Sequence, residues 1–318
     1  MLAICFDGKV VVRRDYPRPS PARSDVLVEV RKAGICATDL EVAKGYMSFR
    51  GVMGHEFIGT VVAGSRQWKG KRVVAEINCV CRRCDMCRSG LSNHCRNRTV
   101  LGISGRDGCF AEYLTVPARN LHEVPDAISD DEAVFIEPVA SALQLVRQVK
   151  LAGAQQVVVL GDGRLAQLIV RVLKGRVKRT VMVGRHAAKL EAAEKQGIQA
   201  VAEEDFVPSA SVAFVVDATG SPSGFDLAMR TVRPRGTIVL KSTFAAVAGL
   251  NLTPLVINEV TLVGSRCGPF PDAIAALAAG KVDVSALISA EFDLPDALAA
   301  LEAAGRGDKL KVLLNVRR

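Results

Sequence analysis

The chain has 318 residues, of which 49% are hydrophobic and 24% charged, so it is long enough for about two globular domains with buried cores. No apolar run approaches the ~20 residues that cross a bilayer, and the N-terminal residues lack the basic and long apolar stretches of a secretory signal, so we expect a cytoplasmic protein with no membrane partner. The net charge is +9, but the basic residues are spread along the chain and aromatic residues make up only 5%, which disfavours a nucleic-acid partner.

The first 140 residues are predicted to be rich in β-structure. The segment that starts at Val26 alternates apolar and polar residues with a period of two, as a half-buried strand does. The segments 59–63 and 71–75 are short β-branched runs that follow or precede glycine-containing turns. We therefore expect the N-terminal part to form a sheet.

Three separated segments of this region carry side chains that bind zinc. They contain Cys36, the pair His55-Glu56 and Glu137. Each is ambiguous alone, because a single cysteine is usually a small buried hydrophobe and a single histidine often makes only a local hydrogen bond. Together they supply a thiolate, an imidazole and carboxylates, a set that zinc accepts while one position stays open for substrate.

Four cysteines lie in one short run, Cys81, Cys84, Cys87 and Cys95, with the spacing C-x2-C-x2-C-x7-C. The segment 81–95 has almost no apolar residues, so it cannot fold on a hydrophobic core, and metal binding would have to supply its folding free energy. The alternative is a pair of disulfides, which a cytosolic redox environment disfavours. The run therefore predicts a closed structural zinc site with four thiolate ligands.

Strands and helices are predicted to alternate after residue 140. The expected strands are 157–160, 180–183, 212–217, 237–241 and 260–263, with helices beginning near 165, 187 and 224 between them. Such alternation is typical of a parallel sheet covered by helices on both faces. A short helix over 294–303 and a terminal strand over 311–316 are expected to follow.

A dinucleotide-binding turn is predicted at Gly161-Asp-Gly163-Arg164-Leu165-Ala, which follows an apolar strand and opens a helix. The first glycine makes the tight turn, the second lets the backbone approach a pyrophosphate, and the small third residue allows close packing of helix on strand. The helix N-terminus at Arg164 and Leu165 would offer unpaired N–H groups to the phosphates. The strand–turn–helix context makes this weak motif persuasive.

The end of the next strand predicts the choice of cofactor. An NAD site usually has an acid there, whereas this chain has Arg185, with Lys189 one helical turn further on. A guanidinium suits a ribose 2′-phosphate, so NADP is expected in preference to NAD. The alternative is that Arg185 stacks on adenine and the enzyme accepts both cofactors.

In this order, the motifs resemble the zinc-dependent branch of the medium-chain dehydrogenase/reductase family, which includes alcohol, sorbitol, threonine and glucose dehydrogenases. The resemblance implies that Cys36, His55 and Glu137 hold a catalytic zinc, and that Glu56 can reach this metal as its coordination changes. It implies that Thr38 relays the substrate proton and that the four-cysteine run holds the structural zinc. Glu41 departs from many alcohol dehydrogenases, which have a histidine there, and resembles several sugar dehydrogenases.

The resemblance also implies an architecture and an activity. The fold would be α/β: a GroES-like catalytic domain over 1–140, a doubly wound Rossmann domain over 141–266, and a return to the catalytic domain over 267–318. The function would be hydride transfer between a secondary alcohol or polyol and NAD(P), with a ketone or aldehyde as product. The alternatives are an NADP-dependent aldose dehydrogenase of the glucose type and a zinc-ribbon nucleic-acid-binding protein. Two zinc ions per chain, a small alcohol, polyol or sugar substrate and a homodimer or homotetramer are expected.

Overall fold

The computed structural model describes residues 1–151, 153–242 and 249–317, which divide into two compact units. Unit 1 comprises Met1–Glu137, Ile274–Ala279 and Ile288–Arg318, and unit 2 comprises Pro138–Ala273 and Gly280–Leu287. The C-terminal segment therefore returns to the unit in which the chain begins. The domain boundaries predicted at residues 140 and 266 stay predictions.

Unit 1 is built on a mainly antiparallel sheet. Its strands, in spatial order, are β11 (Leu121–Glu123), β6 (Arg72–Ala75), β5 (Glu56–Ala63), β3 (Asp25–Ile35), β19 (Lys311–Asn315) and β18 (Ile288–Asp293), and β10 (Tyr113–Pro117) also pairs with β3. A smaller sheet has the order β2 (Val10–Arg13), β1 (Ala3–Phe6) and β4 (Gly51–Val52). The long strand β3 buries most of its residues, which places it in the core of this unit.

Short helices connect these strands. They are α1 (Ala37–Val42), η1 (Tyr46–Ser48), η3 (Ala118–Asn120), α3 (Asp130–Ala133), η5 (Leu294–Asp296) and α10 (Ala297–Gly305). The helix α3 has a complete capping box, because Ser129 accepts from the N–H of Glu132 and the Glu132 side chain accepts from the N–H of Ser129.

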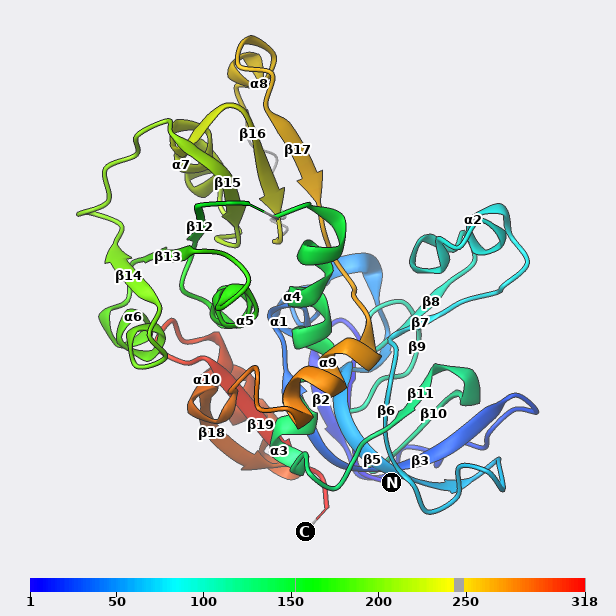
Figure 1. Ribbon diagram of the computed structural model, residues 1–318. Coiled ribbons are helices and arrows are strands. Elements are labelled where there is room, and N and C mark those ends of the chain that lie inside the picture. The colour runs from blue at the N-terminus through cyan, green and yellow to red at the C-terminus, as the bar shows by residue number, and fades with distance from the viewer. Residues whose placement is uncertain (152, 243–248, 318) are drawn as a thin grey trace. The chain divides into compact units, whose positions relative to one another are not determined.

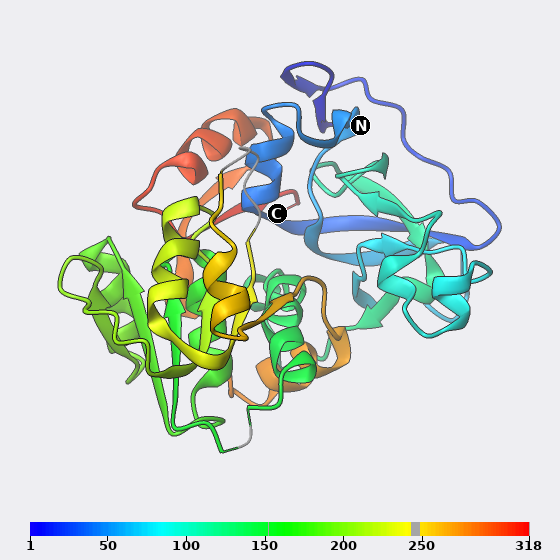
Figure 2. The same cartoon turned by 90° about the horizontal axis from the view of Figure 1, so that it is seen from above.

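The four-cysteine segment forms a loop carried on a third small sheet. The strands of this sheet are β7 (Asn78–Cys79), β8 (Thr99–Leu101) and β9 (Gly105–Arg106). Between β7 and β8 the chain makes only the short turns α2 (Asp85–Arg88) and η2 (Ser92–His94). Figures 1 and 2 show this cyan segment standing out from the strands that carry it. We call residues 81–95 the cysteine lobe.

Unit 2 contains a parallel sheet with the strand order β14-β13-β12-β15-β16-β17. The strands are β12 (Gln156–Leu160), β13 (Arg179–Gly184), β14 (Gln199–Ala202), β15 (Val212–Asp217), β16 (Val232–Leu240) and β17 (Thr261–Gly264). The chain moves outward from β12 in one direction through β13 and β14, and then in the other direction through β15, β16 and β17. This reversal at β12 is the doubly wound arrangement, and it confirms the predicted Rossmann sheet.

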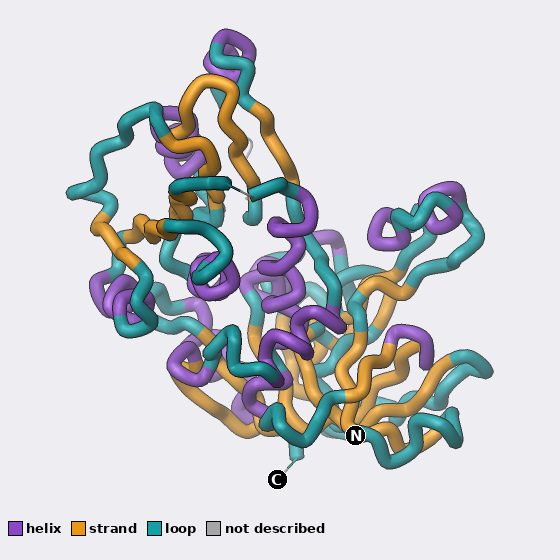
Figure 3. The backbone as a smooth tube through the Cα atoms, in the orientation of Figure 1, coloured by secondary structure: helices purple, strands orange, loops and turns teal. Residues whose placement is uncertain are grey.

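Helices pack on both faces of this sheet. They include α5 (Arg164–Leu173), α6 (Ala187–Glu194) and α7 (Pro222–Thr231), and the unit also contains α8 (Thr253–Ile257) and η4 (Ser285–Leu287). Because right-handed crossovers that run in opposite directions place their helices on opposite faces, α5 and α6 lie on one face and α7 on the other. Figure 3 shows these helices beside the strands of the sheet. The core between α7 and the sheet includes Val158, Val215, Leu227 and Ile238.

Two further helices contain boundaries between the units. They are α4 (Ile136–Gln148) and α9 (Phe270–Ala278). Neither these nor any other helix of the described residues is long and apolar enough to cross a membrane. The predicted strands at 157–160, 212–217 and 311–316 agree with β12, β15 and β19 to within about a residue. The strands β14 and β18 were not predicted, because neither contains a fully buried residue and so neither has the apolar run of a core strand.

Candidate active site and metal centres

Strand pairing in unit 1 brings the predicted ligands of the catalytic metal together. In the antiparallel register of β3 and β5, Gly34 lies opposite Glu56. Cys36 follows Gly34 on one chain segment and His55 precedes Glu56 on the other, so they share one end of the strand pair. The metal-binding atoms of Cys36, His55 and Glu56 all lie within 4.8 Å of one another.

Glycine is required on both sides of this group. A Cβ atom at Gly34 would lie 2.7 Å from Oε2 of Glu56 and 2.5 Å from a methyl carbon of Val134. At Gly54, where φ is +92°, a Cβ would lie 2.2 Å from the ring of the buried Phe110. Both contacts are shorter than van der Waals distance, so a larger side chain at Gly34 would displace the Glu56 carboxylate, and one at Gly54 would displace the Phe110 ring or the backbone that leads into His55.

Buried polar atoms at this end of the strand pair lack hydrogen-bond partners. They are Oε1 of Glu56, together with Oδ1 of Asp39 and Nδ1 of His55, which form an ion pair at 3.2 Å outside hydrogen-bond geometry. Burying a carboxylate oxygen without a partner is costly, so the unpaired Oε1 of Glu56 close to the Cys36 thiol indicates a missing electrophile. A thiolate, an imidazole and a carboxylate are the donors that zinc prefers, and the site therefore fits the metal that the sequence predicted.

Asp39 is a site residue that the sequence analysis missed. Its Oδ2 accepts a hydrogen bond of 2.7 Å from the backbone N–H of Cys36, and its Oδ1 lies 3.2 Å from Nδ1 of His55. Burial of His55 disfavours the imidazolium, but Asp39 and the Cys36 thiol outweigh burial and raise the pKa of His55 well above its usual value. A carboxylate beside a ligating imidazole fixes the ring and its tautomer, so Asp39 is a positioning residue. Its only sequence signal was its place three residues after Cys36.

Glu56 has a second partner within unit 1. The ammonium of Lys311, on β19, pairs with Oε2 of Glu56, and the two side chains are only 2% and 1% exposed. The strand β19 pairs with β3 so that Leu313 faces Gly34, which carries Lys311 to the same end of the sheet as the ligands. Glu56 therefore has one oxygen held by a cation and one, Oε1, unpartnered.

The other predicted residues of the catalytic centre lie on α1 and α4. Thr38 is half-buried on the first turn of α1, with its Oγ1 3.9 Å from Sγ of Cys36. Glu41, on the same helix, pairs with the exposed Lys44 at 2.8 Å. Glu137 is half-buried on the first turn of α4, and within the described chain it is outside the group of ligand atoms that Cys36, His55 and Glu56 form.

The cysteine lobe brings its four sulfur atoms together as predicted. The metal-binding atoms of Cys81, Cys84, Cys87 and Cys95 lie within 4.8 Å of one another, and none of these cysteines forms a disulfide. The Sγ of Cys95 lies 3.5 Å from that of Cys81 and 3.8 Å from that of Cys84. Four mutually close thiols at the tips of tight turns fit a tetrahedral zinc.

Backbone N–H groups favour the thiolate form of Cys81 and Cys84, whose pKa values are lowered, whereas burial raises the pKa of Cys87 to about 12. Hydrogen bonds from the backbone of Arg83 and Cys84 lower the pKa of Cys81 to about 6. The side-chain amide of Asn97 also donates to the Cys81 sulfur at 3.7 Å. Metals bind the thiolate, so these contacts prepare Cys81 as a ligand near neutral pH.

The dinucleotide loop of unit 2 has the predicted strand–turn–helix geometry. Gly161 has φ of +104°, and a Cβ there would lie 2.9 Å from the carbonyl oxygen of Ala218. Gly163 is the N-cap of α5, and a Cβ there would meet nothing within 4 Å. Arg164 and Leu165 form the half-buried first turn of the helix. The open space beside the helix N-terminus suits an approaching phosphate.

Asp162 lies between the two glycines, and its carboxylate contacts the backbone that follows β13. Its Oδ2 accepts hydrogen bonds from the backbone N–H groups of Arg185 at 2.7 Å and His186 at 2.8 Å. Burial would raise the pKa of Asp162, but these bonds and that of the His186 ring outweigh it and lower the pKa. A Cβ at Gly184 would lie 2.5 Å from the Asp162 side chain, so the two residues are mutually dependent.

The two basic residues predicted to bind the cofactor differ in exposure. Arg185 is exposed and makes two hydrogen bonds to Glu203, at 2.8 and 2.6 Å. Lys189 is buried, with its ammonium 3.9 Å from Oδ1 of Asp162. Arg185 is therefore the basic side chain of this pair that faces solvent at the end of β13.

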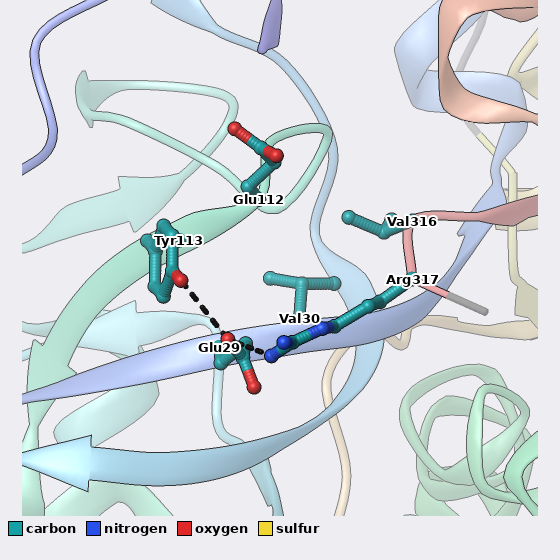
Figure 4. A pocket seen from close by; sticks show the side chains of 6 residues that line it. All are labelled: Glu29, Val30, Glu112, Tyr113, Val316 and Arg317. Atoms are coloured by element: carbon teal, nitrogen blue, oxygen red, sulfur yellow. Dashed lines mark hydrogen bonds and ion pairs between the residues drawn. The ribbon is translucent and has the colours of Figure 1, made fainter. Parts of the chain in front are cut away.

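A small pocket of unit 1 contains none of the predicted site residues. Its cavity of about 130 Å³ is lined by Glu29, Val30, Glu112, Tyr113, Val316 and Arg317. Figure 4 shows Glu29 directed toward Tyr113 and Arg317, while Glu112 points away: Glu29 accepts a hydrogen bond of 2.9 Å from the Tyr113 hydroxyl and pairs with Arg317. The volume is below the roughly 300 Å³ at which ligand sites begin, so this pocket does not compete with the sites above.

Two family models match the chain, one in the N-terminal part and one in the part that contains the parallel sheet. The alcohol dehydrogenase GroES-like domain matches residues 22–126, and the zinc-binding dehydrogenase domain matches residues 165–281. The chain belongs to the zinc-dependent medium-chain dehydrogenase/reductase family. These medium-chain dehydrogenases combine the two domains that the sequence predicted here.

Similar proteins cover nearly the whole chain. L-threonine 3-dehydrogenase of Salmonella arizonae is 28% identical over 95% of both chains. A putative zinc-binding dehydrogenase of Sinorhizobium meliloti 1021, solved with NADP, has a TM-score of 0.91 at 26% identity and covers 99% of both chains. A protein described as a short chain alcohol dehydrogenase from E. coli CFT073, solved with NADH, has a TM-score of 0.89 at 29% identity and covers 99% of both chains.

These findings confirm the predicted class of this medium-chain dehydrogenase. The α/β fold with its GroES-like unit, the activity of an oxidoreductase and the use of zinc with NAD(P) agree with the sequence analysis. The individual ligand and relay assignments stay predictions, because the comparisons concern whole domains.

Proposed function

We propose that this medium-chain dehydrogenase interconverts a secondary alcohol or polyol with the corresponding ketone or aldehyde, with NAD(P) as hydride acceptor. The observation that carries the proposal is the group of Cys36, His55 and Glu56, whose metal-binding atoms lie within 4.8 Å of one another and include the unpartnered Oε1 of Glu56. The reaction also requires a bound dinucleotide, for which the glycine-containing loop of unit 2 would supply the site.

Cys36 and His55 would hold the catalytic zinc with one carboxylate. Glu137 is the third ligand that the sequence predicts, and Glu56 is the carboxylate that lies within the group. Since Lys311 holds one oxygen of Glu56, Glu56 would serve through Oε1 when the coordination changes. When bound, zinc supplies a Lewis acid for the substrate oxygen, and the nicotinamide supplies the hydride chemistry.

Thr38 would accept the proton of the substrate hydroxyl at its Oγ1, which lies beside the Cys36 sulfur. Glu41, one turn further along α1, would be the next station toward solvent, since its side chain is partly exposed and paired with Lys44. Asp39 keeps Cys36 and His55 in place during this transfer. The cysteine lobe would hold the structural zinc through its four thiolates.

The substrate would be a small alcohol whose carbinol carbon has polar neighbours. Glu137 and Glu41 resemble the polyol and sugar members of the family, and the similar L-threonine 3-dehydrogenase is named for a substrate of this kind. An aldose is the second candidate.

The predicted homodimer or homotetramer would form at β17, the edge strand of the parallel sheet, where Leu262 is exposed. A reducing compartment such as the cytoplasm suits the free thiols of the lobe.

The deciding experiment assays alcohols, polyols, aldoses and L-threonine with NAD and NADP in parallel, with zinc measured on the same sample. We expect two zinc ions per chain and turnover of a secondary alcohol with at least one cofactor. A preparation that holds both metals and binds nucleotide, but oxidises no member of the panel, would contradict the proposed substrate class. One that holds no zinc after purification without chelators would contradict the mechanism.

A further inference from the structure

Arg185 and Glu203 occupy equivalent positions after neighbouring parallel strands. In the register of β13 and β14, Gly184 lies beside Ala202, and each of the two charged residues comes next along its strand. The guanidinium donates from Nε and from a terminal nitrogen to the two carboxylate oxygens, at 2.8 and 2.6 Å. This two-bond geometry is the strongest arrangement that an arginine and a carboxylate adopt.

The backbone of Arg185 is also fixed. Its N–H donates to the buried carboxylate of Asp162, which holds the start of the side chain against the dinucleotide loop. The pairing with Glu203 raises the pKa of Arg185 above its usual value. Arg185 is therefore anchored at both ends, by Asp162 at the backbone and by Glu203 at the guanidinium.

A pocket of about 320 Å³ opens at this place, lined by Gly184, Arg185, Ala202, Glu203 and Glu204. It contains one cationic and two anionic side chains. In doubly wound sheets, the residues after this strand meet the adenosine ribose of a dinucleotide. A ribose 2′-phosphate carries up to about two negative charges, so it would enter a pocket in which carboxylates outnumber the guanidinium.

We propose that Glu203 is a specificity-determining residue for the cofactor, which sets the balance between NAD and NADP by holding Arg185. A 2′-phosphate must take the guanidinium from Glu203 and tolerate two nearby carboxylates, whereas a 2′-hydroxyl needs neither change. Glu203 thus counteracts the preference for NADP that Arg185 alone predicts. This inference rests on the proposed binding of a dinucleotide at Gly161–Gly163.

The test uses Glu203→Gln, which removes the charge and keeps a similar shape. Isothermal titration calorimetry measures the binding of 5′-AMP and of 2′,5′-ADP, which differ only in the 2′-phosphate, to the purified zinc-loaded protein. We expect the affinity for 2′,5′-ADP to rise about tenfold, and that for 5′-AMP to change less than about twofold. The gain in affinity should shrink as salt is added, since Arg185 is exposed and Glu203 is partly exposed.

Two further variants distinguish the effect of the Arg185–Glu203 contact from the effect of the pocket's net charge. Glu204→Gln removes an equal charge from the same pocket, where no contact between Glu204 and Arg185 is among the hydrogen bonds and ion pairs of the described residues. It should therefore give a clearly smaller gain. Adding Arg185→Ala to Glu203→Gln should abolish the gain.

The outcomes distinguish this inference from the proposed function. Equal affinity of wild type and Glu203→Gln for 2′,5′-ADP, or an equal gain in Glu204→Gln, overturns the role of Glu203 while AMP binding leaves the nucleotide site standing. Absence of binding of both nucleotides to the wild-type protein overturns the proposed site and this inference together.

Discussion

Lys311 and Glu56 form a buried ion pair between β19 and the start of β5, at the end of the sheet where Cys36 and His55 meet. The ammonium also lies 5.5 Å from the centroid of the Phe135 ring. A residue near the end of the sequence thus fixes a carboxylate of the candidate metal centre, within the unit that the C-terminal segment rejoins.

Replacing Lys311 by methionine should destabilise unit 1 strongly. Glu56 would be left buried without its cation, at a cost of about 3–5 kcal/mol in the free energy of unfolding. Chemical denaturation followed by circular dichroism measures this cost. The double variant with Glu56→Gln should recover much of the loss, because no unpaired charge remains. A loss below about 1 kcal/mol in the single variant would show that water reaches the pair.

Asp39→Asn should weaken the catalytic zinc without affecting the structural zinc. The amide loses the charge that holds His55 and the backbone of Cys36, and loss of such a partner typically lowers metal affinity about 10–100-fold. Competition with a chelator, followed by elemental analysis, measures both sites. Asp25→Asn is the matched control, since Asp25 is a buried carboxylate of the same unit paired with Arg106. Equal zinc loss in both variants would argue against a positioning role.

The two cysteine sites should respond differently to serine. Cys36→Ser should abolish turnover and leave the fold and nucleotide binding largely intact, while Cys84→Ser should lower the melting temperature. Each should reduce the zinc content from two ions per chain to one. Full activity in Cys36→Ser, or an unchanged melting temperature in Cys84→Ser after loss of its zinc, would refute the respective role.

Asp162→Asn should destabilise unit 2 by about 1–3 kcal/mol, because buried N–H donors lose a charged acceptor. The pKa of Asp162 is lowered in the folded protein, so its contribution is present above the ordinary value of 3.8 and is lost as the pH falls through the folded pKa. The stability difference between wild type and variant should therefore narrow below about pH 4. A difference that does not change with pH would contradict this account.

If the subunits associate at β17, charged substitutions of exposed apolar residues near this strand should weaken the association. Val256 and Ile257 are 79% and 73% exposed on α8, close in sequence to the edge strand. Replacing both by aspartate should shift the protein toward monomer, because buried charges are costly at an interface. Light scattering after size exclusion measures the mass. Leu298→Asp, at a 49% exposed leucine of α10, should leave the mass unchanged. A wild-type monomer would contradict the proposed interface.

The sequence alone determined the features that depend on local spacing. The cysteine lobe could be predicted because its four ligands lie within 15 residues and the segment has no apolar core of its own. The dinucleotide loop and the parallel sheet could be predicted because glycine conformation and strand–helix alternation are local properties. For the same reason, residues 36, 55 and 56 could be named from their motifs.

The contacts between residues far apart in the sequence depend on how the strands pair. Lys311 reaches Glu56 through the pairing of β19 with β3, and Glu203 reaches Arg185 through the register of two parallel strands. Neither pairing follows from sequence spacing, because strand order and register are set by burial of whole faces. For this reason the prediction of NADP from Arg185 did not include Glu203. The pairing of β3 with β5 likewise brought Cys36 to His55 and Glu56.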